Sequence, residues 1–405
     1  MLGTSLDDEG ILTRGLRRAR TALSIAAAAV ALAACANTFD QLGGGTAVQQ
    51  GTEQPPGAMI GTGQVRVGLI LPLSAPGNAG VAAQSMKNAA EMALAEFKEP
   101  NIQLLVKDDG GTPQGAQAAA QQALDEGAEI IVGPLFAQSV SAVSGVARTR
   151  NIPVIAFSTD ASVAARGVHL LSFLPESDVK RIVDYAISRG KRSFAALLPD
   201  NAYGAVVEAA FQQEVARRGG RVLAIEKYSL EPGKMAEPIR RVARAAGRVD
   251  SIFIPDGADA VPQVVAGLAS AGVNLKRVQL LGTGLWDDPH IFSTAALDDG
   301  WYAAPESAGF RNFTNRYRAR FGQDPVRTAT LAYDAVALVA ALVKTQGAQR
   351  FSEQVLTTSS GFAGIDGIFR FRPDGTNERG LSVLRVAPSG GQAISPAPRS
   401  FAPGT

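Results

Sequence analysis

The chain has 405 residues, of which 46% are hydrophobic and 19% are charged, and its formal net charge is +2. This length is enough for two lobes with a large core, and the charged residues form no basic stripe of the kind that DNA-binding domains carry. The sequence has one Cys and two His, which excludes an internal disulfide and a zinc-ligand cluster. We therefore expect no nucleic-acid partner, no metal and no cofactor.

Residues 1–34 have the pattern of a secretory signal peptide. Several arginines between residues 14 and 20 precede an apolar run over 22–34, which is too short to span a bilayer comfortably. The run ends in Leu-Ala-Ala-Cys35 and resembles a bacterial lipobox, in which the cysteine is acylated. A plain signal peptide with a chance cysteine is the alternative, but the only Cys of the chain falls at the cleavage position. We expect a lipid on Cys35 that anchors the protein to a membrane, on the periplasmic side of the cell envelope.

Two segments flank the expected folded body. Residues 35–64 are rich in Gly, Gln, Thr and Pro, and residues 388–405 have a similar composition. Such segments contain too few apolar side chains to fold alone. We expect a flexible tether over 35–64 and a disordered tail over 388–405.

From residue 65 onward, patterns typical of strands and helices alternate. The run over 65–72 is almost continuously apolar, as in strands that are buried on both faces. Further strands are expected at 102–106, 128–132, 153–157 and 169–174, with helices at 81–97, 113–124 and 139–150. Strands that alternate with helices predict a parallel sheet covered by helices.

The alternation restarts after about residue 175, which indicates a second, similar lobe. Strands are expected at 194–198, 222–228, 251–254 and 278–281, and helices at 202–218, 235–246 and 261–271. The last part differs, with helices at 310–321 and 328–343 before a loop and a strand over 361–371. The pair Asp374-Gly375 then marks a tight turn.

Several short motifs occur in a specific order. They are the strand and loop over 67–74, Asp108-Asp109 with Pro113, Gly133-Pro134, 152–155, Tyr203-Gly204, and 364–375. Together they resemble type I periplasmic binding proteins of the leucine/isoleucine/valine-binding family, over about residues 65–387.

The resemblance implies an α/β fold of two Rossmann-like lobes, with parallel sheets joined by three hinge crossings near residues 175, 305 and 364. The first lobe would contain 65–175 and 306–364, and the second 176–305 and 365–387. It also implies that the lobes close on a ligand by hinge motion.

Ligands of open α/β sheets bind beyond the carboxyl ends of the strands. The candidate ligand-binding residues therefore come from loops that follow strands: Ser74, Asn78, Gln138, Ser139, Ser158, Thr159, Asp160, Tyr203, Asp256 and Trp286. Tyr203 is the candidate that the resemblance supports best, because the family uses an aromatic residue of the second lobe there.

Each candidate also has a structural interpretation. Ser74 and Asn78 suit a polar turn, Ser139 and the group over 158–160 suit helix caps, and Tyr203 suits packing on a helix start. The chain departs from the family pattern as well: Ala137 stands where amino-acid receptors usually have a hydroxyl residue, and no acid lies within the turn over 282–284. An amine buried there without a partner would be costly, so the sequence departs from the pattern that binds a free α-amino acid.

We expect a non-enzymatic protein, because the chain has neither a nucleophile elbow nor a phosphate-binding loop, and His169 and His290 are isolated. The predicted function is capture of a small polar, amino-acid-like ligand, an amino acid or a peptide fragment, for an ABC-type permease. The alternative function is that of penicillin-binding protein activators, which the chain also resembles. These are outer-membrane lipoproteins that stimulate a peptidoglycan synthase by direct contact. A cleft filled by Phe136 or Trp286 would favour that alternative.

Overall fold

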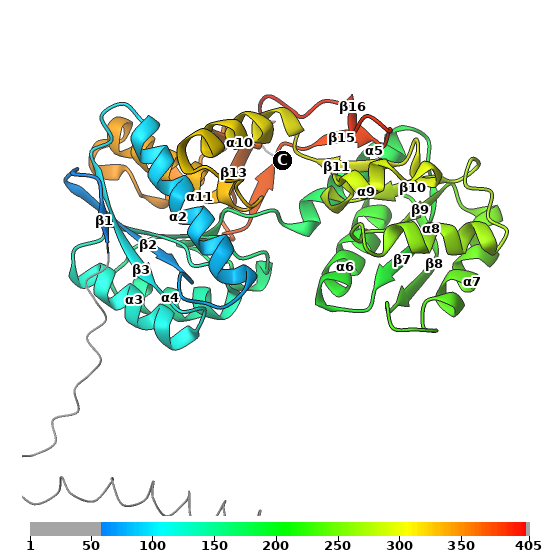
Figure 1. Cartoon of the computed structure of the whole chain (residues 1–405), viewed down its shortest axis with the longest axis horizontal. Helices are drawn as coiled ribbons and strands as arrows, with labels where there is room; N and C mark the ends of the chain where they lie inside the picture. Colours follow the sequence, from blue (N-terminus) through cyan, green and yellow to red (C-terminus); the bar gives the residue numbers. More distant parts are fainter. Residues whose placement is uncertain (1–57, 402–405) are drawn as a thin grey trace, which may run out of the picture. The chain divides into compact units, whose positions relative to one another are not determined.

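The computed structural model describes residues 58–401, so the predicted signal peptide, Cys35 and most of the predicted tether lie outside the described residues. The described part of the chain contains two α/β lobes, coloured mainly blue to cyan and green to yellow in Figure 1. None of its helices is long and apolar enough to cross a membrane.

The first lobe is built on a six-stranded sheet with the order β1-β3-β2-β4-β5-β6. Its strands are β1 (Met59–Ile60), β2 (Val65–Leu71), β3 (Ile102–Asp108), β4 (Ile130–Val132), β5 (Val154–Ala156) and β6 (Val168–Leu170). All neighbours pair in parallel except β1, which is antiparallel to β3. The prediction of a flexible tether as far as residue 64 is therefore wrong for its last residues, because β1 is part of the sheet. The parallel order agrees with the continuous apolar runs, because both faces of such a sheet are covered.

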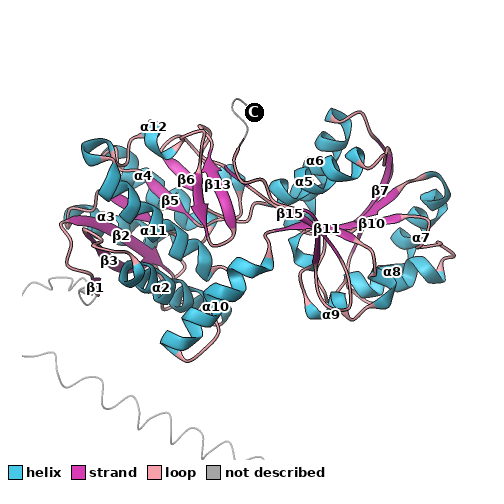
Figure 2. Cartoon of the chain, turned by 90° about the horizontal axis from the view of Figure 1, so that it is seen from above, coloured by secondary structure: helices cyan, strands magenta, loops and turns pink. Residues whose placement is uncertain are grey.

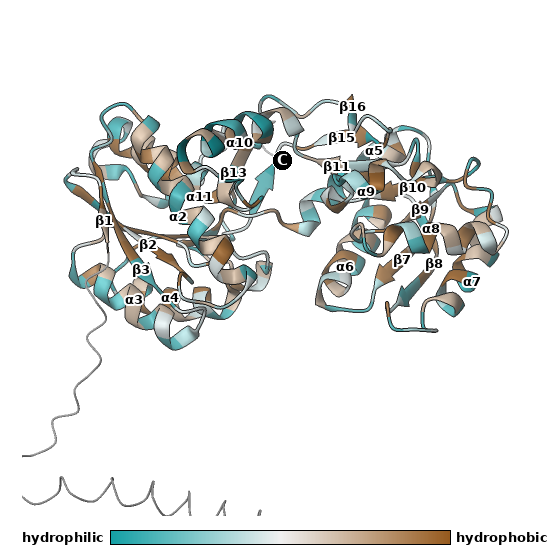
Figure 3. Cartoon of the chain, viewed as in Figure 1, coloured by the Kyte–Doolittle hydropathy of each residue, from teal (hydrophilic) through white to brown (hydrophobic). Residues whose placement is uncertain are grey.

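Helices cover both faces of this sheet. One buried cluster joins one face of β2 to α2 (Asn78–Glu96) and α11 (Ala329–Thr345). Another joins the opposite face to α3 (Pro113–Asp125) and α4 (Ala137–Thr149). In Figure 3, β2 is brown, whereas the helices carry both teal and brown residues, as expected for helices that bury one face.

The second lobe has a seven-stranded sheet with the order β16-β15-β11-β10-β9-β7-β8. Its strands are β7 (Ser193–Pro199), β8 (Arg221–Tyr228), β9 (Ser251–Phe253), β10 (Gln279–Gly282), β11 (Trp301–Ala304), β15 (Ser382–Arg385) and β16 (Gln392–Ser395). The first five pair in parallel, and β15 and β16 extend the edge in antiparallel fashion. The helices of this lobe are α5 (Pro175–Ser188), α6 (Ala202–Arg217), α7 (Ala236–Ala245), α8 (Val261–Ser270) and the short α9 (Pro289–Phe292).

The chain passes between the lobes three times, at about 171–175, 305–307 and 380–381. Helix α10 (Ser307–Phe321) returns the chain to the first lobe, where Phe313 and Tyr317 pack on α2. The short α12 (Glu353–Leu356) then precedes a small sheet of β12 (Phe362–Gly364), β13 (Gly367–Phe371) and β14 (Asn377–Arg379).

The third crossing was predicted near Gly364, and the structure corrects this. Phe369 and Phe371 of β13 belong to the same buried cluster as β2 and α11, and the Leu170 N–H donates to the Gly375 carbonyl over 2.8 Å. The small sheet is therefore part of the first lobe, and the chain leaves it only after β14. Figure 2 shows β13 beside β5 and β6.

The sequence patterns missed elements at the lobe junction. Helix α5 was not predicted, although Pro175 stands in its first turn and Glu176 and Asp178 suit a helix start. The predicted disordered tail is wrong for residues 388–401, because β16 pairs with β15 and Ile394 packs on the core of the second lobe. A polar strand at a sheet edge carries little apolar alternation, so composition alone does not reveal it.

Gly133 follows the last residue of β4, at a point where its backbone lies very close to the backbone of β2. Its φ is +97°, and a Cβ atom there would lie 2.0 Å from the Ile70 carbonyl oxygen. Only glycine fits both conditions, which explains this residue at the carboxyl end of the strand.

We predict that Gly133→Ala destabilises the protein by about 1–3 kcal/mol or more, because the added methyl meets backbone and the φ is unfavourable. Gly145→Ala on α4 is the matched control, since nothing lies within 4 Å of its Cβ position. The control should raise stability by up to about 1 kcal/mol, as alanine favours helices. Thermal unfolding of both variants measures this, and equal stability of the two would contradict the close contact.

Candidate functional site

The first lobe carries a polar edge where β2 and β3 end. The Ser74 N–H donates to Asp108 Oδ1 over 3.1 Å, and the Gly110 N–H donates to the same oxygen over 2.9 Å. Although partial burial acts in the opposite direction, these hydrogen bonds hold the pKa of Asp108 below its usual range. The Ser74 side chain is exposed, so this candidate lies at the surface of the edge.

Asp109 and Ser139 form a buried pair behind this edge. Asp109 is 1% exposed, and its Oδ1 accepts the Gly111 N–H over 2.7 Å. Burial raises the pKa of Asp109 to about 6, against hydrogen bonds from Gly111 and Ser139. Ser139 is fully buried and its hydroxyl serves the loop that follows β3. The prediction of Ser139 as a direct ligand contact is therefore wrong: the side chain supports the edge from inside.

The N-terminus of α4 has no side-chain cap. Phe136 stands at the N-cap position, where its side chain accepts no hydrogen bond, and Gln138 lies exposed in the first turn. The first N–H groups of a helix need acceptors, and together with the helix dipole they favour an anion. Asn78 lies exposed at the start of α2, which is also without a side-chain cap.

The loop after β5 is largely occupied with its own turn. Ser158 is 3% exposed and its Oγ accepts the Asp160 N–H over 3.1 Å. Asp160 in turn accepts the Ser162 N–H over 2.9 Å and caps a single 3₁₀ turn. The capping interpretation is confirmed for Asp160, which leaves Thr159 as the exposed side chain of the three that does not cap the turn.

The second lobe gathers four polar side chains at the carboxyl edge of its sheet, from the start of α6, the end of β8 and the loops after β9 and β10. The hydroxyl groups of Tyr203 and Thr283 lie 3.1 Å apart. Nearby, the Tyr228 hydroxyl donates to Asp256 Oδ2 over 2.6 Å, and the Gly257 N–H donates to Asp256 Oδ1 over 2.8 Å. Burial raises the pKa values of both tyrosines, and the charge of Asp256 acts on both in the same direction. Tyr203 and Asp256, predicted separately, thus belong to one cluster.

Sequence reasoning missed Asp178, which joins this cluster from α5. Its Oδ2 accepts the Gly284 N–H over 2.9 Å, from a position 106 residues earlier in the chain. Burial raises the pKa of Asp178 to about 7, and the Gly284 hydrogen bond limits the rise. The turn over 282–284 therefore does have a carboxyl group beside it. The only sequence signal was an acidic residue in the first turn of an unrecognised helix.

Trp286 is not a site residue, and its prediction as one is wrong. It is completely buried in the core of the second lobe, and its Nε1 donates to the Ile254 carbonyl over 3.0 Å. The 3₁₀ turn after β10 directs the indole inward, above Gly282, where a Cβ atom would lie 2.2 Å from the ring. Because Gly282 has no side chain, it leaves the space that the indole ring fills.

The candidate set thus divides between the two lobes. Within the described residues, no hydrogen bond or ion pair joins the candidates of the first lobe to those of the second. The part of the chain that the structure describes also holds no group of His, Cys, Asp and Glu suited to a metal. His169 is fully buried beside Phe371, and exposed His290 contacts Asp288.

The raised pKa of Asp178 predicts a pH dependence of stability. The folded-state pKa of about 7 lies above the unfolded value of about 3.9, so the folded state binds this proton more tightly than the unfolded state. The stability that results is complete below about pH 4 and is lost as the pH rises to about 7. Asp178→Asn removes this loss of stability, because an amide does not titrate in this pH range. The stability of the variant relative to the wild type should therefore increase from pH 5 to pH 8, by at most about 1.4 kcal/mol per pH unit.

Denaturant unfolding across this pH range measures the difference, with exposed Asp259→Asn as the control. The control should follow the wild type at every pH. Parallel curves for Asp178→Asn and the wild type would contradict a raised pKa of the carboxyl group at this position.

The two-lobed fold with polar carboxyl edges defines a class of binding protein, and sequence comparison identifies it. Residues 64–392 match the model of the periplasmic binding protein family, and the chain belongs to this family. The expectation of a type I periplasmic binding protein is thereby confirmed.

Two curated relatives share about a fifth of their aligned residues with this chain. The chain is 21% identical over 224 residues to a Leu/Ile/Val-binding protein homolog of Brucella melitensis, covering 52% of this chain and 57% of that protein. The chain spans about half the length of the curated relatives it matches.

Two solved structures show how closely the fold is shared. A putative branched-chain amino acid ABC transporter protein of Rhodospirillum rubrum is 18% identical, with a TM-score of 0.73 over 82% of this chain and 99% of that one. A solute-binding protein of Rhodopseudomonas palustris, in complex with 3,4-dihydroxybenzoic acid, is 21% identical, with a TM-score of 0.61 over 84% of this chain and 99% of that one. At these identities the likeness shows the shared fold.

Proposed function

We propose that the protein is a solute-binding protein that captures a small amino-acid-like ligand between its lobes and delivers it to an ABC-type permease. The observation that carries the proposal is the cluster of Tyr203, Asp256 and Thr283 at the carboxyl edge of the second sheet. In open α/β sheets this edge is where ligands bind.

The two edges suit opposite ends of a zwitterion. The uncapped N-terminus of α4 in the first lobe suits a carboxylate, because its N–H groups and dipole favour negative charge. Asp256 in the second lobe suits an ammonium group, because its carboxylate is fixed by Tyr228 and Gly257. Closure of the lobes on such a ligand would satisfy both ends at once.

The named ligands of relatives agree with a carboxylate as the common feature. The Rhodopseudomonas protein binds a benzoic acid, and the Brucella relative is named for branched-chain amino acids. A benzoate has no ammonium group, so only the amino-acid ligand makes use of Asp256. A change at Asp256 should therefore weaken the binding of amino acids but not the binding of benzoates.

Membrane attachment is part of the proposal. The lipobox-like sequence that ends at Cys35 supports a lipid anchor on the periplasmic side of the envelope, with the segment between Cys35 and β1 as a tether. An anchored receptor would stay close to its membrane permease while its lobes bind solute.

The second candidate function is that of a penicillin-binding protein activator. Phe136 supports it, since this aromatic side chain is 38% exposed at the start of α4, where a ligand carboxylate would otherwise approach. The burial of Trp286 removes the other residue that was expected to fill the cleft. An activator would need no small ligand, and its partner would be a peptidoglycan synthase.

A thermal-shift screen of the purified protein against L-amino acids, benzoates and short muropeptides tests the two functions. A ligand at a hundredfold excess over its dissociation constant stabilises the native state by about 2.7 kcal/mol. We expect an amino acid to give the largest shift. Absence of any shift across the panel would contradict solute binding and favour the activator.

Two variants locate the site. Asp256→Asn should weaken amino-acid binding roughly 10- to 100-fold, since a hydrogen bond to a charged group contributes roughly 1.5–3 kcal/mol. Tyr203→Phe should also weaken binding, because it removes the hydroxyl group that pairs with Thr283. Asp259→Asn, an exposed acid in the same loop as Asp256, is the matched control. Calorimetric titration gives the affinities, and equal loss in the control would place the site elsewhere.

A further inference from the structure

The C-terminal segment of the described chain is fixed to the second lobe by β16. This strand pairs with β15 in antiparallel register, with Val383 opposite Ser395 and Arg385 opposite Gln392. The ladder places the segment along the edge of the second sheet, directly beside the third crossing. The segment then continues for six described residues beyond the strand.

Arg181 of α5 holds this segment and the third crossing together. Its Nε donates to the Leu381 carbonyl over 2.7 Å, and its Nη2 donates to Ser395 Oγ over 2.8 Å. The same Nη2 also lies 3.3 Å from the carbonyl oxygens of Ser395 and Pro396. A single guanidinium group thus binds the crossing at 381 and the tail at 395–396, both on the side of the second lobe.

The end of the segment packs on the first lobe. The Arg370 guanidinium carbon lies 4.6 Å from the centre of the Phe401 ring, within range of a cation–π contact. A Cβ atom at Gly361 would lie 2.8 Å from Phe401 Cε2, and one at Gly380 would lie 3.2 Å from the Pro398 carbonyl oxygen. The tail therefore lies closely against the small sheet of β12, β13 and β14.

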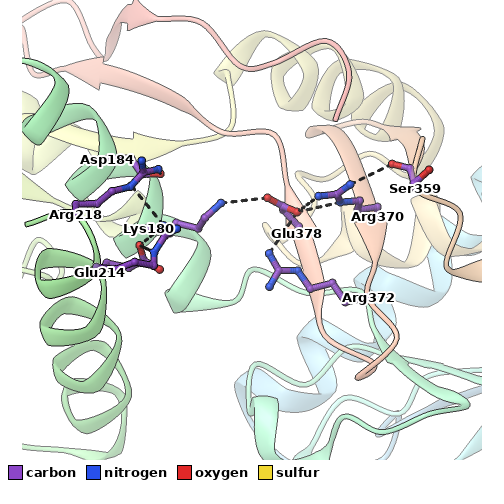
Figure 4. A network of polar contacts seen from close by, with 9 residues as sticks. Lys180, Asp184, Glu214, Arg218, Ser359, Arg370, Arg372 and Glu378 are labelled. Carbon is purple, nitrogen blue, oxygen red and sulfur yellow. Dashed lines mark hydrogen bonds and ion pairs between the residues drawn. The ribbon is translucent and has the colours of Figure 1, made fainter. Parts of the chain in front are cut away.

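An ion-pair chain connects the lobes beneath the same segment. Lys180 Nζ of α5 lies 3.3 Å from Glu378 Oε1 of β14, and Arg370 donates to Glu378 Oε2 over 2.7 Å (Figure 4). Arg372 also contacts Glu378, at 3.3 Å. Arg370, whose side chain is 7% exposed, is therefore both the partner of Glu378 and the support of the Phe401 ring.

These contacts surround a cavity of about 870 Å³ at the lobe junction. One wall is formed by α5 and α6 of the second lobe, a second wall by β14 of the first lobe, and the tail contributes Ser395, Pro396, Pro398 and Phe401. The space next to the junction is thus closed on one side by the tail. A change in the angle between the lobes would alter the distance that the tail spans.

We propose that residues 392–401 form a strap across the third crossing that restrains the relative movement of the lobes, with Phe401 as its anchor on the first lobe. The strap is tied to the second lobe by the ladder of β16 and by Arg181. The restraint on lobe movement depends only on contacts of the strap with both lobes. Its effect on ligand release rests, in addition, on the proposed solute binding.

Distance measurement between spin labels on the two lobes tests the strap without any ligand. Labels on Gln114→Cys and Asp259→Cys, both exposed beside carboxyl ends of strands, report the separation of the lobes, with Cys35→Ala removing the native thiol. Phe401→Ala should shift the equilibrium between lobe arrangements by about two- to thirtyfold, the range that cation–π contacts support. A chain ending at Ser395 should shift it in the same direction and at least as far.

The control is Ser400→Ala, an exposed neighbour that should give the wild-type distance distribution. Thermal unfolding first establishes that each variant is folded, and the truncated chain keeps β16, so it separates loss of the strap from loss of the sheet edge. An unchanged distribution in Phe401→Ala and in the truncated chain would overturn the strap, as would an equal change in Ser400→Ala. Because no ligand is added, failure of this test is independent of failure to find a solute.

Discussion

The junction of the two lobes is built around one aromatic ring that contacts two arginines. Phe173 of the first crossing has the Arg327 guanidinium 4.6 Å from its ring centre and the Arg379 guanidinium at the same distance. Arg327 also lies 4.5 Å from the ring of Phe310, just after the second crossing, and Arg379 ends β14, just before the third. All three crossings therefore meet in one set of contacts.

Buried charge makes this junction specific. Arg327 forms a bidentate pair with the buried Asp366, at 2.6 and 2.9 Å, while the Nε of Arg379 donates to the Ser172 carbonyl over 2.9 Å. Burial raises the pKa of Asp334 to about 7, and the nearby Arg379 and Arg327 limit that rise. Charged groups are costly to bury unless they are paired, so an arrangement of the crossings that separated Arg327 from Asp366 would leave the buried Asp366 carboxylate without this partner.

The junction also positions the candidate site. Helix α5 begins immediately after Phe173, and its first turn brings Asp178 to the Gly284 N–H at the edge of the second sheet. The cluster of Tyr203, Thr283 and Asp256 is thus connected to the hinge through one carboxyl group. In hinge closure this edge would move as one unit with α5, which follows the first crossing.

Local sequence patterns predicted the elements with a clear apolar pattern, such as the continuously apolar strand β2 and the amphipathic helix α3. They missed α5 because the alternation of strands and helices is interrupted at the first crossing. They missed β16 because an edge strand can be polar. Tyr203 and Asp256 could be predicted from their places after strands. Asp178, Arg379 and the inward rotation of Trp286 could not, because each depends on contacts between residues far apart in the chain.

Calorimetric comparison of an L-amino acid with its deaminated 2-oxo acid tests the central claim, binding of a zwitterion between the α4 N-terminus and Asp256, most directly. The two compounds share the carboxylate and the side chain and differ at the group that Asp256 would hold. The account predicts that the amino acid binds and that the 2-oxo acid binds at least about tenfold more weakly, the equivalent of about 1.4 kcal/mol. Equal affinities, or no binding by any amino acid, would contradict it.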